Sequence, residues 1–129
     1  MGELEKRNLE VVKHWAEFYN DDVERMVTEC YAENCTAASM FGGSKIEGTQ
    51  RFLKLEQRVL KTAPRRRIRL NHSYAVGDVV VVEATLFDAD QGDEWQSAFC
   101  AVLTFKDGKI VEDRTYLDET RWPGMQRKQ

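Results

Sequence analysis

The sequence predicts an α+β domain, in which three helices cover one face of a curved antiparallel sheet. Apolar residues recur at helical spacing through the first half of the chain, and they alternate with polar residues at strand spacing through the second half. The chain has 129 residues, the size of a single domain, which we expect to be ordered from about residue 5 to about residue 124. A sheet bent around helices leaves a cone, and a cone that is open at one end is suited to bind a small molecule.

Three helices are predicted in the first half. The first has an apolar face between residues 9 and 19 and ends at the polar turn 20–22, which also caps the second helix. The second helix keeps its apolar period from residue 23 to residues 32–34. The third begins near residues 48–49 and ends before Pro64, because the residue that precedes a proline disfavours the helical conformation.

The other segments predict strands and the turns between them. Residues 35–41 are small and apolar without a helical period, which indicates a short strand, and residues 42–44 form a loop. Asp107-Gly108 fits a tight two-residue turn, and Gly77-Asp78 marks another. Four sequential antiparallel strands follow from these turns, at residues 66–74, 79–87, 94–105 and 109–118.

Composition and charge exclude several classes of protein. The chain has 19 Lys and Arg and 22 Asp and Glu, a net charge of −3, so nucleic acid is not expected as its main partner. The basic cluster at residues 61–69 fits a solvated or interface stripe, because three of its arginines lie opposite Ile68. No apolar run approaches the roughly 20 residues that cross a bilayer and no signal peptide is recognisable, so we expect a cytoplasmic protein without a membrane partner. Three cysteines outside any CxxC pattern indicate reduced thiols, and neither a metal nor another cofactor is expected.

Turn and cap motifs follow one another in a characteristic order along the chain. This order resembles the SnoaL-like branch of the nuclear transport factor 2-like superfamily over roughly residues 8 to 120. The resemblance implies the cone-shaped fold, but it leaves the activity open because the superfamily includes isomerases, dehydratases, epoxide hydrolases, cyclases and non-catalytic binders. The motifs are Asn20-Asp21-Asp22, Tyr31-Ala32-Glu33-Asn34, Ile46-Glu47-Gly48, Gly77-Asp78, Asp107-Gly108-Lys109-Ile110 and Tyr116-Leu117-Asp118.

Two catalytic sets of the superfamily are replaced in this sequence. Aligned by the turn motifs, Trp15, Ser39 and Ala101 stand where ketosteroid isomerases have a tyrosine, an aspartate base and a second acid. Neither that chemistry nor epoxide hydrolysis is therefore expected. The epoxide hydrolase positions, which need an arginine, two aspartates, a tyrosine and an asparagine, are occupied by Ala84, Leu86, Thr115, Ala37 and Ser39.

The resemblance to scytalone dehydratase and the bile-acid dehydratases points to His72 and Tyr19 as catalytic residues. His72 shares a strand face with Ile68 and Leu70, so alternation directs it into the cone. The dehydratase acid falls on Asn20, and whether Asp21 or Asp22 replaces it stays open. A buried neutral histidine with a purely structural role is the alternative for His72.

Asp113 is the one carboxylate on the late strands that is expected to point into the pocket. It shares a face with Thr115, and the epoxide hydrolase comparison places that face inside. Burial would raise the pKa of Asp113 towards neutrality and suit it to proton transfer, unless an arginine at the mouth of the cone pairs with it. The expected walls of the pocket, some of which could instead be ordinary core, are Trp15, Phe18, Ser39, Phe41, Trp95, Phe99 and Thr115.

Two functions are compatible with these residues. The first is a cofactor-independent dehydratase, isomerase or cyclase that acts on a hydrophobic, ring-containing molecule, with His72 and Asp113 as acid and base. The second is a non-catalytic module that binds such a molecule. A separation of roughly 8 Å or less between these two side chains favours the enzyme, whereas exposure of either one to solvent favours the binding module.

The outer face of the predicted sheet carries more apolar side chains than a solvated face needs. An isologous homodimer through this convex face would bury them, although valine also simply favours strands. Glu83 and Arg114 lie among them and could pair across the two-fold axis. The other residues of this face are Val79, Val81, Ala98, Cys100, Val102 and Tyr116.

Overall fold

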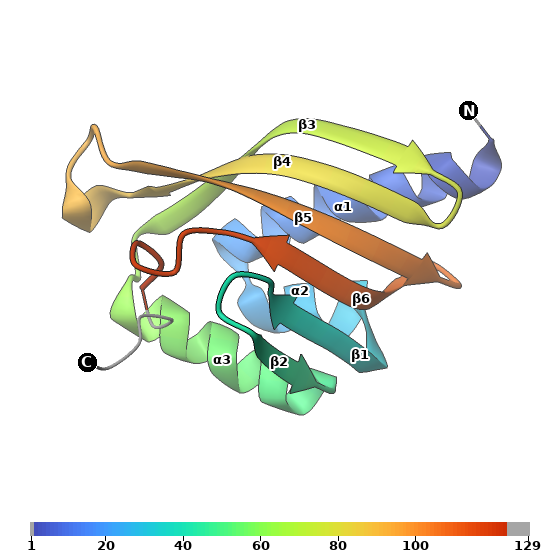
Figure 1. Ribbon diagram of the computed structural model, residues 1–129, viewed down its shortest axis with the longest axis horizontal. Coiled ribbons are helices and arrows are strands. Elements are labelled where there is room, and N and C mark those ends of the chain that lie inside the picture. The colour runs from blue at the N-terminus through green and yellow to red at the C-terminus, as the bar shows by residue number, and fades with distance from the viewer. Residues whose placement is uncertain (1, 124–129) are drawn as a thin grey trace.

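A computed structural model describes residues 2–123 of the chain, apart from the side chain of Ser44 (Figure 1). The fraying expected after Gly124 lies outside the described residues. At the other end the first helix begins at Glu3, earlier than expected. The Glu5 carboxylate explains this early start, because it accepts hydrogen bonds from the backbone N–H of Gly2 (3.2 Å) and of Gly77 (3.0 Å), which fastens the helix end to a strand turn.

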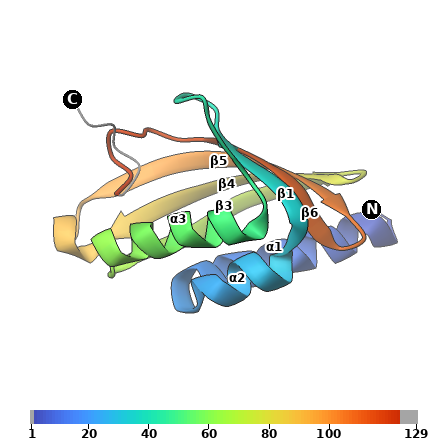
Figure 2. The ribbon, with the colours of Figure 1, turned by 90° about the horizontal axis from the view of Figure 1, so that it is seen from below.

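The described residues, 2–123, form three helices and six strands. All three helices lie on one side of a single curved sheet (Figure 2). The elements in order are α1 (Glu3–Asp21), α2 (Val23–Cys30), β1 (Tyr31–Ser39), β2 (Ser44–Glu47), α3 (Thr49–Thr62), β3 (Arg66–Val76), β4 (Val79–Asp88), a 3₁₀ turn (Ala89–Gln91), β5 (Gln96–Lys106) and β6 (Lys109–Tyr116).

The sheet is mixed rather than purely antiparallel. Its strand order is β2-β1-β6-β5-β4-β3, so the predicted meander of the second half is present and β1 is added at its free edge. β1 pairs with β6 in parallel, whereas the other pairings are antiparallel. The α+β cone is therefore confirmed, and the expectation of an entirely antiparallel sheet is wrong because β1 runs in the same direction as β6.

Two boundaries in the first half differ from the sequence prediction. The second helix ends at Cys30, and Tyr31 is already extended (φ −107°, ψ 144°), so the segment 31–34 belongs to β1. Residues 44–47 form β2, which the sequence analysis placed in or beyond a loop; it pairs with β1 from Thr36 opposite Glu47 to Ser39 opposite Ser44. A strand of four residues is too short to establish an alternating pattern.

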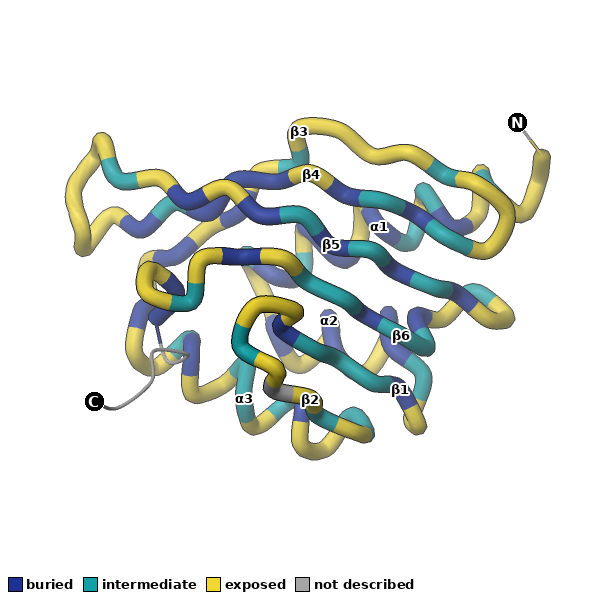
Figure 3. The backbone as a smooth tube through the Cα atoms, in the orientation of Figure 1, coloured by how far each residue is buried: buried dark blue, intermediate teal, exposed yellow. Residues whose placement is uncertain are grey.

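The core lies between the helices and the concave face of the sheet. Along β4, Val80, Val82, Ala84 and Leu86 are buried and alternate with more exposed residues, as the period-two pattern predicts (Figure 3). Val12 on α1 and Val27 on α2 are fully buried against them. Within residues 2–123, no helix is long and apolar enough to cross a membrane.

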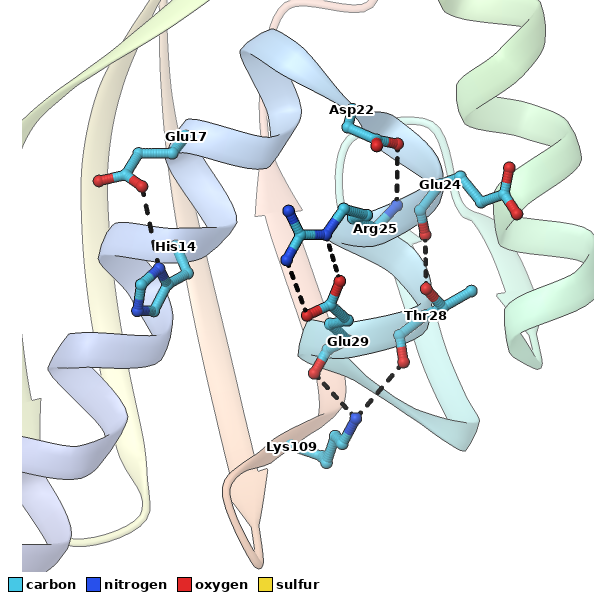
Figure 4. A network of polar contacts seen from close by, with 8 residues as sticks. All are labelled: His14, Glu17, Asp22, Glu24, Arg25, Thr28, Glu29 and Lys109. Carbon is cyan, nitrogen blue, oxygen red and sulfur yellow. Dashed lines mark hydrogen bonds and ion pairs between the residues drawn. The ribbon is translucent and has the colours of Figure 1, made fainter.

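Hydrogen bonds fix the two ends of the helical layer to the sheet. The Asn20 side chain accepts from the backbone N–H of Ile68 (2.7 Å) and donates to its carbonyl (3.0 Å), which binds the end of α1 to β3. The Lys109 ammonium at the start of β6 donates to the carbonyls of Thr28 (3.4 Å) and Glu29 (2.9 Å) at the end of α2 (Figure 4). A cation at this helix terminus satisfies carbonyls that have no partner within the helix.

Candidate active site

A cavity of about 390 Å³ lies between α1, α3 and the concave face of the sheet. Most of its wall is apolar and aromatic, which is typical of a site for a small organic molecule. The main apolar lining residues are Trp15, Met26, Phe52, Leu55, Phe99 and Trp122, and the polar ones are Tyr19, Tyr31, Ser39, Glu56, Arg58, Asp113, Thr115 and Glu119.

Asp113 is held in this wall by two hydroxyl groups. Tyr31 Oη donates to Asp113 Oδ2 (2.7 Å), and Thr115 Oγ1 donates to Asp113 Oδ1 (2.5 Å). Asp113 is 6% exposed, and on β6 it lies opposite Leu103 of β5 and Ala37 of β1. The strand register therefore fixes the carboxylate at the inner face, and its partners are hydroxyls instead of the arginine that the alternative prediction required.

Tyr31 connects Asp113 to a second donor. Its hydroxyl accepts a hydrogen bond from Trp15 Nε1 (3.0 Å), and its ring packs edge-on against Phe52, with ring centroids 4.7 Å apart. Trp15 is on α1, Tyr31 begins β1 and Asp113 is on β6, so three elements converge at the carboxylate. The result is a directed chain of hydrogen bonds from Trp15 through Tyr31 to Asp113.

Burial controls the electrostatics of this group. It raises the pKa of Asp113 above the ordinary value of an aspartate, while the hydrogen bonds from Thr115 and Tyr31 act in the opposite direction. Burial, followed by the charge of Asp113, raises the pKa of Tyr31 well above that of a free phenol. Tyr31 therefore stays a neutral donor at pH 7, and Asp113 is a carboxyl with an increased affinity for protons.

A second polar cluster lies at the α3 side of the cavity. The Glu56 carboxylate is 3.6 Å from the guanidinium of Arg66, and Arg66 also lies over the ring of Tyr19, with 4.1 Å from Cζ to the ring centroid. Burial raises the pKa of Glu56 to about 7, although the charge of Arg66 lowers it. Burial also raises the pKa of Tyr19.

The prediction that His72 points into the cone is wrong. A β-bulge in β3 changes the register between Leu70, which pairs with Ala84, and His72, which pairs with Glu83. The extra residue at the bulge moves the following side chains to the opposite face, so His72 is exposed on the convex side, where it stacks on Tyr74. The expected acid–base pair of His72 and Asp113 is therefore not formed.

Three predicted wall residues also lie outside the cavity. Phe18 is half-buried at the edge of the core beside α2, where Arg25 lies over its ring at 4.3 Å, and it does not line the cavity. Phe41 is 74% exposed in the β1–β2 turn, because the turn projects beyond the sheet. Trp95 precedes β5 and is covered by Arg121 at 4.8 Å instead of by a helix. The structure places the remaining predicted site residues in the wall: Trp15, Tyr19, Ser39, Phe99, Asp113 and Thr115.

The acidic residues near the end of α1 do not replace the dehydratase acid. Asp22 caps α2 by accepting from the backbone N–H of Arg25 (3.2 Å), and Asp21 is exposed. Asn20, which occupies the position of the acid, binds the backbone of Ile68. All three therefore have structural places outside the cavity wall.

Four important residues of the site were missed by the sequence analysis. Tyr31 was assigned to a helix end, and Trp122 follows the last strand in a segment without a period. Glu56 follows Phe52 by four residues, and Arg66 precedes Ile68 by two, so both share faces with apolar residues. A charged residue on an otherwise apolar face of a helix or strand indicates a buried polar group, and this signal could have identified Glu56 and Arg66.

The described part of the chain contains no group of three or more His, Cys, Asp or Glu side chains that could hold a metal ion. The side chains that line the cavity instead offer hydroxyl and carboxyl groups, the guanidinium of Arg58 and aromatic surfaces. These groups can transfer protons and can orient a ligand by hydrogen bonds.

Comparison with known proteins gives both a family and a fold. The model of the SnoaL-like domain matches residues 11–113. No curated protein matches the sequence. Many solved structures share the fold, among them the following three. One is a candidate SnoaL-like polyketide cyclase from a Jannaschia species (TM-score 0.80, 19% identity, covering 92% of this chain and 90% of that one).

The other two structures carry different descriptions. One is a hypothetical protein with a ketosteroid isomerase-like fold from Catenulispora acidiphila (TM-score 0.76, 17% identity, covering 88% of each chain). The second is an LEH-like epoxide hydrolase from M. tuberculosis (TM-score 0.69, 20% identity, covering 91% of this chain and 86% of that one). At these identities the likeness establishes the fold alone.

Proposed function

We propose, for a chain that belongs to the SnoaL-like domain family, that its cavity binds a hydrophobic, ring-containing small molecule. The cavity of about 390 Å³ is within the usual range for sites of small organic ligands. Aromatic walls from Trp15, Phe52 and Phe99 offer flat surfaces on which a ring can stack. This binding is the part of the function that the geometry supports best.

Proton transfer by Asp113 is the reaction that this site would perform on a bound ligand. The single observation that carries it is the buried carboxylate, oriented by Tyr31 and Thr115 in the wall of the cavity. In this reaction Asp113 takes a proton from a C–H bond of the ligand, and the electron pair of that bond shifts into the ligand. The protonated Asp113 then returns the proton at another position or to a leaving hydroxyl.

Such a cycle is balanced without an oxidant or a second reactant. It is compatible with isomerisation, cyclisation or dehydration, and it uses one carboxyl in turn as base and acid. Because His72 is outside the cavity, the cycle does not use a histidine.

Non-catalytic binding is the second candidate function. The exposure of His72 favours it, because a paired acid and base was the feature expected to distinguish an enzyme from a binding module. In that case Asp113 and Tyr31 would serve only as hydrogen-bonding groups for the ligand.

The test begins with a thermal-shift screen against polyketides, steroids and terpenoids, since a ligand that binds the folded state raises the melting temperature. Compounds that bind are then assayed for turnover. Asp113→Asn keeps the shape of the wall, and we expect it to lower turnover roughly a hundredfold or more while the ligand still binds.

Asp21→Asn is the matched control, because Asp21 is an exposed aspartate, and we expect it to keep full turnover. An Asp113→Asn variant with full turnover would contradict proton transfer by Asp113. Binding without turnover in the wild-type protein would favour the binding module.

A further inference from the structure

The cluster of Tyr19, Glu56 and Arg66, which we call the Glu56 cluster, is assembled from α1, α3 and β3. Tyr19 and Glu56 line the cavity, and Arg66 lies behind them with no exposed surface. The Arg66 guanidinium contacts both, at 3.6 Å from Glu56 Oε2 and 4.1 Å from the centre of the Tyr19 ring. Arg66 thus positions the other two side chains at the cavity wall.

Across residues 2–123, several buried polar atoms of this cluster have no partner at normal hydrogen-bond distance, although the Arg66 guanidinium lies close enough to Tyr19 and Glu56 to stabilise their ionised forms. Among the described residues, none hydrogen-bonds to Tyr19 Oη, Glu56 Oε2 or the three guanidinium nitrogens of Arg66. Tyr19 is 5% exposed and Arg66 is fully buried. Buried polar groups in folded proteins are nearly always paired. Tyr19 and Glu56 line the cavity, so a bound molecule can supply the partner that they lack, whereas Arg66 is out of reach of the cavity and is compensated by the charge of Glu56.

We propose that the Glu56 cluster is a second contact point of the cavity, and that it binds a hydroxyl group on the ring-containing ligand. The hydroxyl donates its hydrogen bond to Glu56 and accepts one from Tyr19. This inference rests on the proposed function only in using the same cavity. It narrows the ligand class to hydroxylated ring compounds, with the hydroxyl held at the α3 side while Asp113 contacts another part of the molecule.

Charge selects a hydroxyl over an ionised group. Glu56 and Arg66 are oppositely charged and close together, so the cluster offsets its own charge. A ligand carboxylate would face the carboxylate of Glu56, and a ligand ammonium would face the guanidinium of Arg66. A neutral hydroxyl avoids both penalties, and it has the donor and the acceptor that Glu56 and Tyr19 require.

The protonation of Glu56 is also compatible with a hydroxyl partner. Burial raises the pKa of Glu56 to about 7, so both the ionised and the protonated carboxyl are accessible near neutral pH. The ionised form accepts a hydrogen bond from the ligand hydroxyl, and the protonated form donates one to it. A hydroxyl can satisfy either form.

Two probes of similar shape test this contact. 2-Naphthol carries the hydroxyl, and 2-methylnaphthalene replaces it with a methyl group. Equilibrium dialysis with naphthalene fluorescence gives both dissociation constants, and their ratio, methyl over hydroxyl, measures how much the protein favours the hydroxyl. Comparing this ratio between variants cancels the difference in hydrophobicity between the probes.

Tyr19→Phe removes only the unpaired hydroxyl of the cluster, and we expect it to lower the ratio about tenfold, as loss of one hydrogen bond to a buried partner does. The paired change Glu56→Met with Arg66→Met removes both charges together, which avoids an uncompensated buried ion, and we expect a similar loss. If the double variant does not fold, Tyr19→Phe decides alone. A ratio that stays within twofold of wild type in Tyr19→Phe overturns the proposal.

Asp113→Asn separates this proposal from the proposed function. Because Asp113 contacts the ligand, this variant can weaken the binding of both probes, but the ratio changes only if the hydroxyl itself lies at Asp113, so we expect the wild-type ratio. If Asp113→Asn lowers the ratio instead, the hydroxyl binds at Asp113 and the second contact point is refuted, while proton transfer by Asp113 still stands. Failure of the wild-type protein to bind either probe would also refute the inference.

Discussion

The hydroxyl groups around Asp113 determine what this carboxyl can do. An arginine partner would stabilise the carboxylate and lower its pKa, which would weaken it as a base, whereas Tyr31 and Thr115 orient the group without neutralising it. Since burial has the larger effect, the proton affinity of Asp113 is increased. This combination of fixed geometry and increased basicity is what proton abstraction requires.

Glu56 makes the stability of the folded protein depend on pH. Its pKa rises from 4.5 to about 7 on folding, so between these values the folded state binds more protons than the unfolded state. The free energy of unfolding should therefore fall as pH rises from about 5 to about 7.5, by on the order of 1–3 kcal/mol from this residue. Urea denaturation at several pH values measures this slope.

Glu56→Gln is the control for that measurement, because it removes the titrating group and keeps the side-chain shape. We expect a flatter dependence on pH in the variant. Parallel curves for the two proteins over this range would show that Glu56 does not titrate between pH 5 and pH 7.5.

The sequence predicted the correct face of the sheet for some residues but not for others. Asp113 could be placed at the inner face because the alternation of β6 from Asp113 to Thr115 is regular and continues to Leu117, just after the strand. His72 could not, because the β-bulge after Leu70 inserts one residue into β3 and no glycine or proline marks it. One such insertion exchanges the two faces of the rest of the strand.

At the scale of elements, the contact between α2 and β6 depends on Lys109. Its ammonium donates to two carbonyls at the C-terminus of α2, a helix of eight residues (Figure 4). The last turn of this helix has no basic residue of its own to satisfy these carbonyls. Lys109→Met keeps the length of the side chain but removes both hydrogen bonds. We expect a loss of about 1 kcal/mol in the free energy of unfolding.

Lys106→Met is the matched control, since Lys106 is an exposed lysine at the other side of the same turn. Chemical denaturation of both variants measures the difference. Equal stability of the two would mean that the Lys109 contacts contribute nothing measurable.

Helices and strands whose hydrophobic pattern extends over many residues could be predicted from the sequence. Strands that are defined by their pairing with distant segments could not. α3 and the strands of the second half were placed within a few residues, because their patterns extend over many positions. β2 has four residues, and the parallel position of β1 beside β6 depends on contacts that are distant in sequence. The sequence could therefore not show that residues of β1, such as Tyr31, lie beside residues of β6, such as Asp113, in the cavity wall.

At the scale of the molecule, the convex face of the sheet carries one mainly apolar row of side chains, flanked by rows that mix apolar and polar residues. Cross-strand register aligns Tyr74, Val81, Val102 and Arg114 in one row. Tyr74 is 55% exposed, and the helices lie on the other side of the sheet (Figure 2). An exposed apolar surface of this kind is typical of an interface.

We expect a second copy of the chain to cover this face. An isologous dimer would place the Tyr74–Arg114 row against its own copy and should bury roughly 1,000 Å² or more in total. Arg114 forms an ion pair with Glu112 of its own chain, so pairing with Glu83 across the axis would add to or replace that contact. Light scattering at micromolar concentration should then give twice the 15.0 kDa mass of the chain. A mass near that of one chain would refute the dimer.

Val102→Asp tests whether this particular face forms the interface. Val102 lies between Val81 and Arg114 and is partly exposed, so an aspartate there would be solvated in a monomer but would bring two like charges close to the axis of a dimer. We expect this variant to be monomeric by light scattering, with an unchanged far-UV circular dichroism spectrum, whereas Val102→Thr, which keeps the side-chain shape, should remain dimeric. A dimer that persists in Val102→Asp would place the interface elsewhere, and loss of folding would mean that Val102 belongs to the core, because only a buried position converts one new charge into global unfolding.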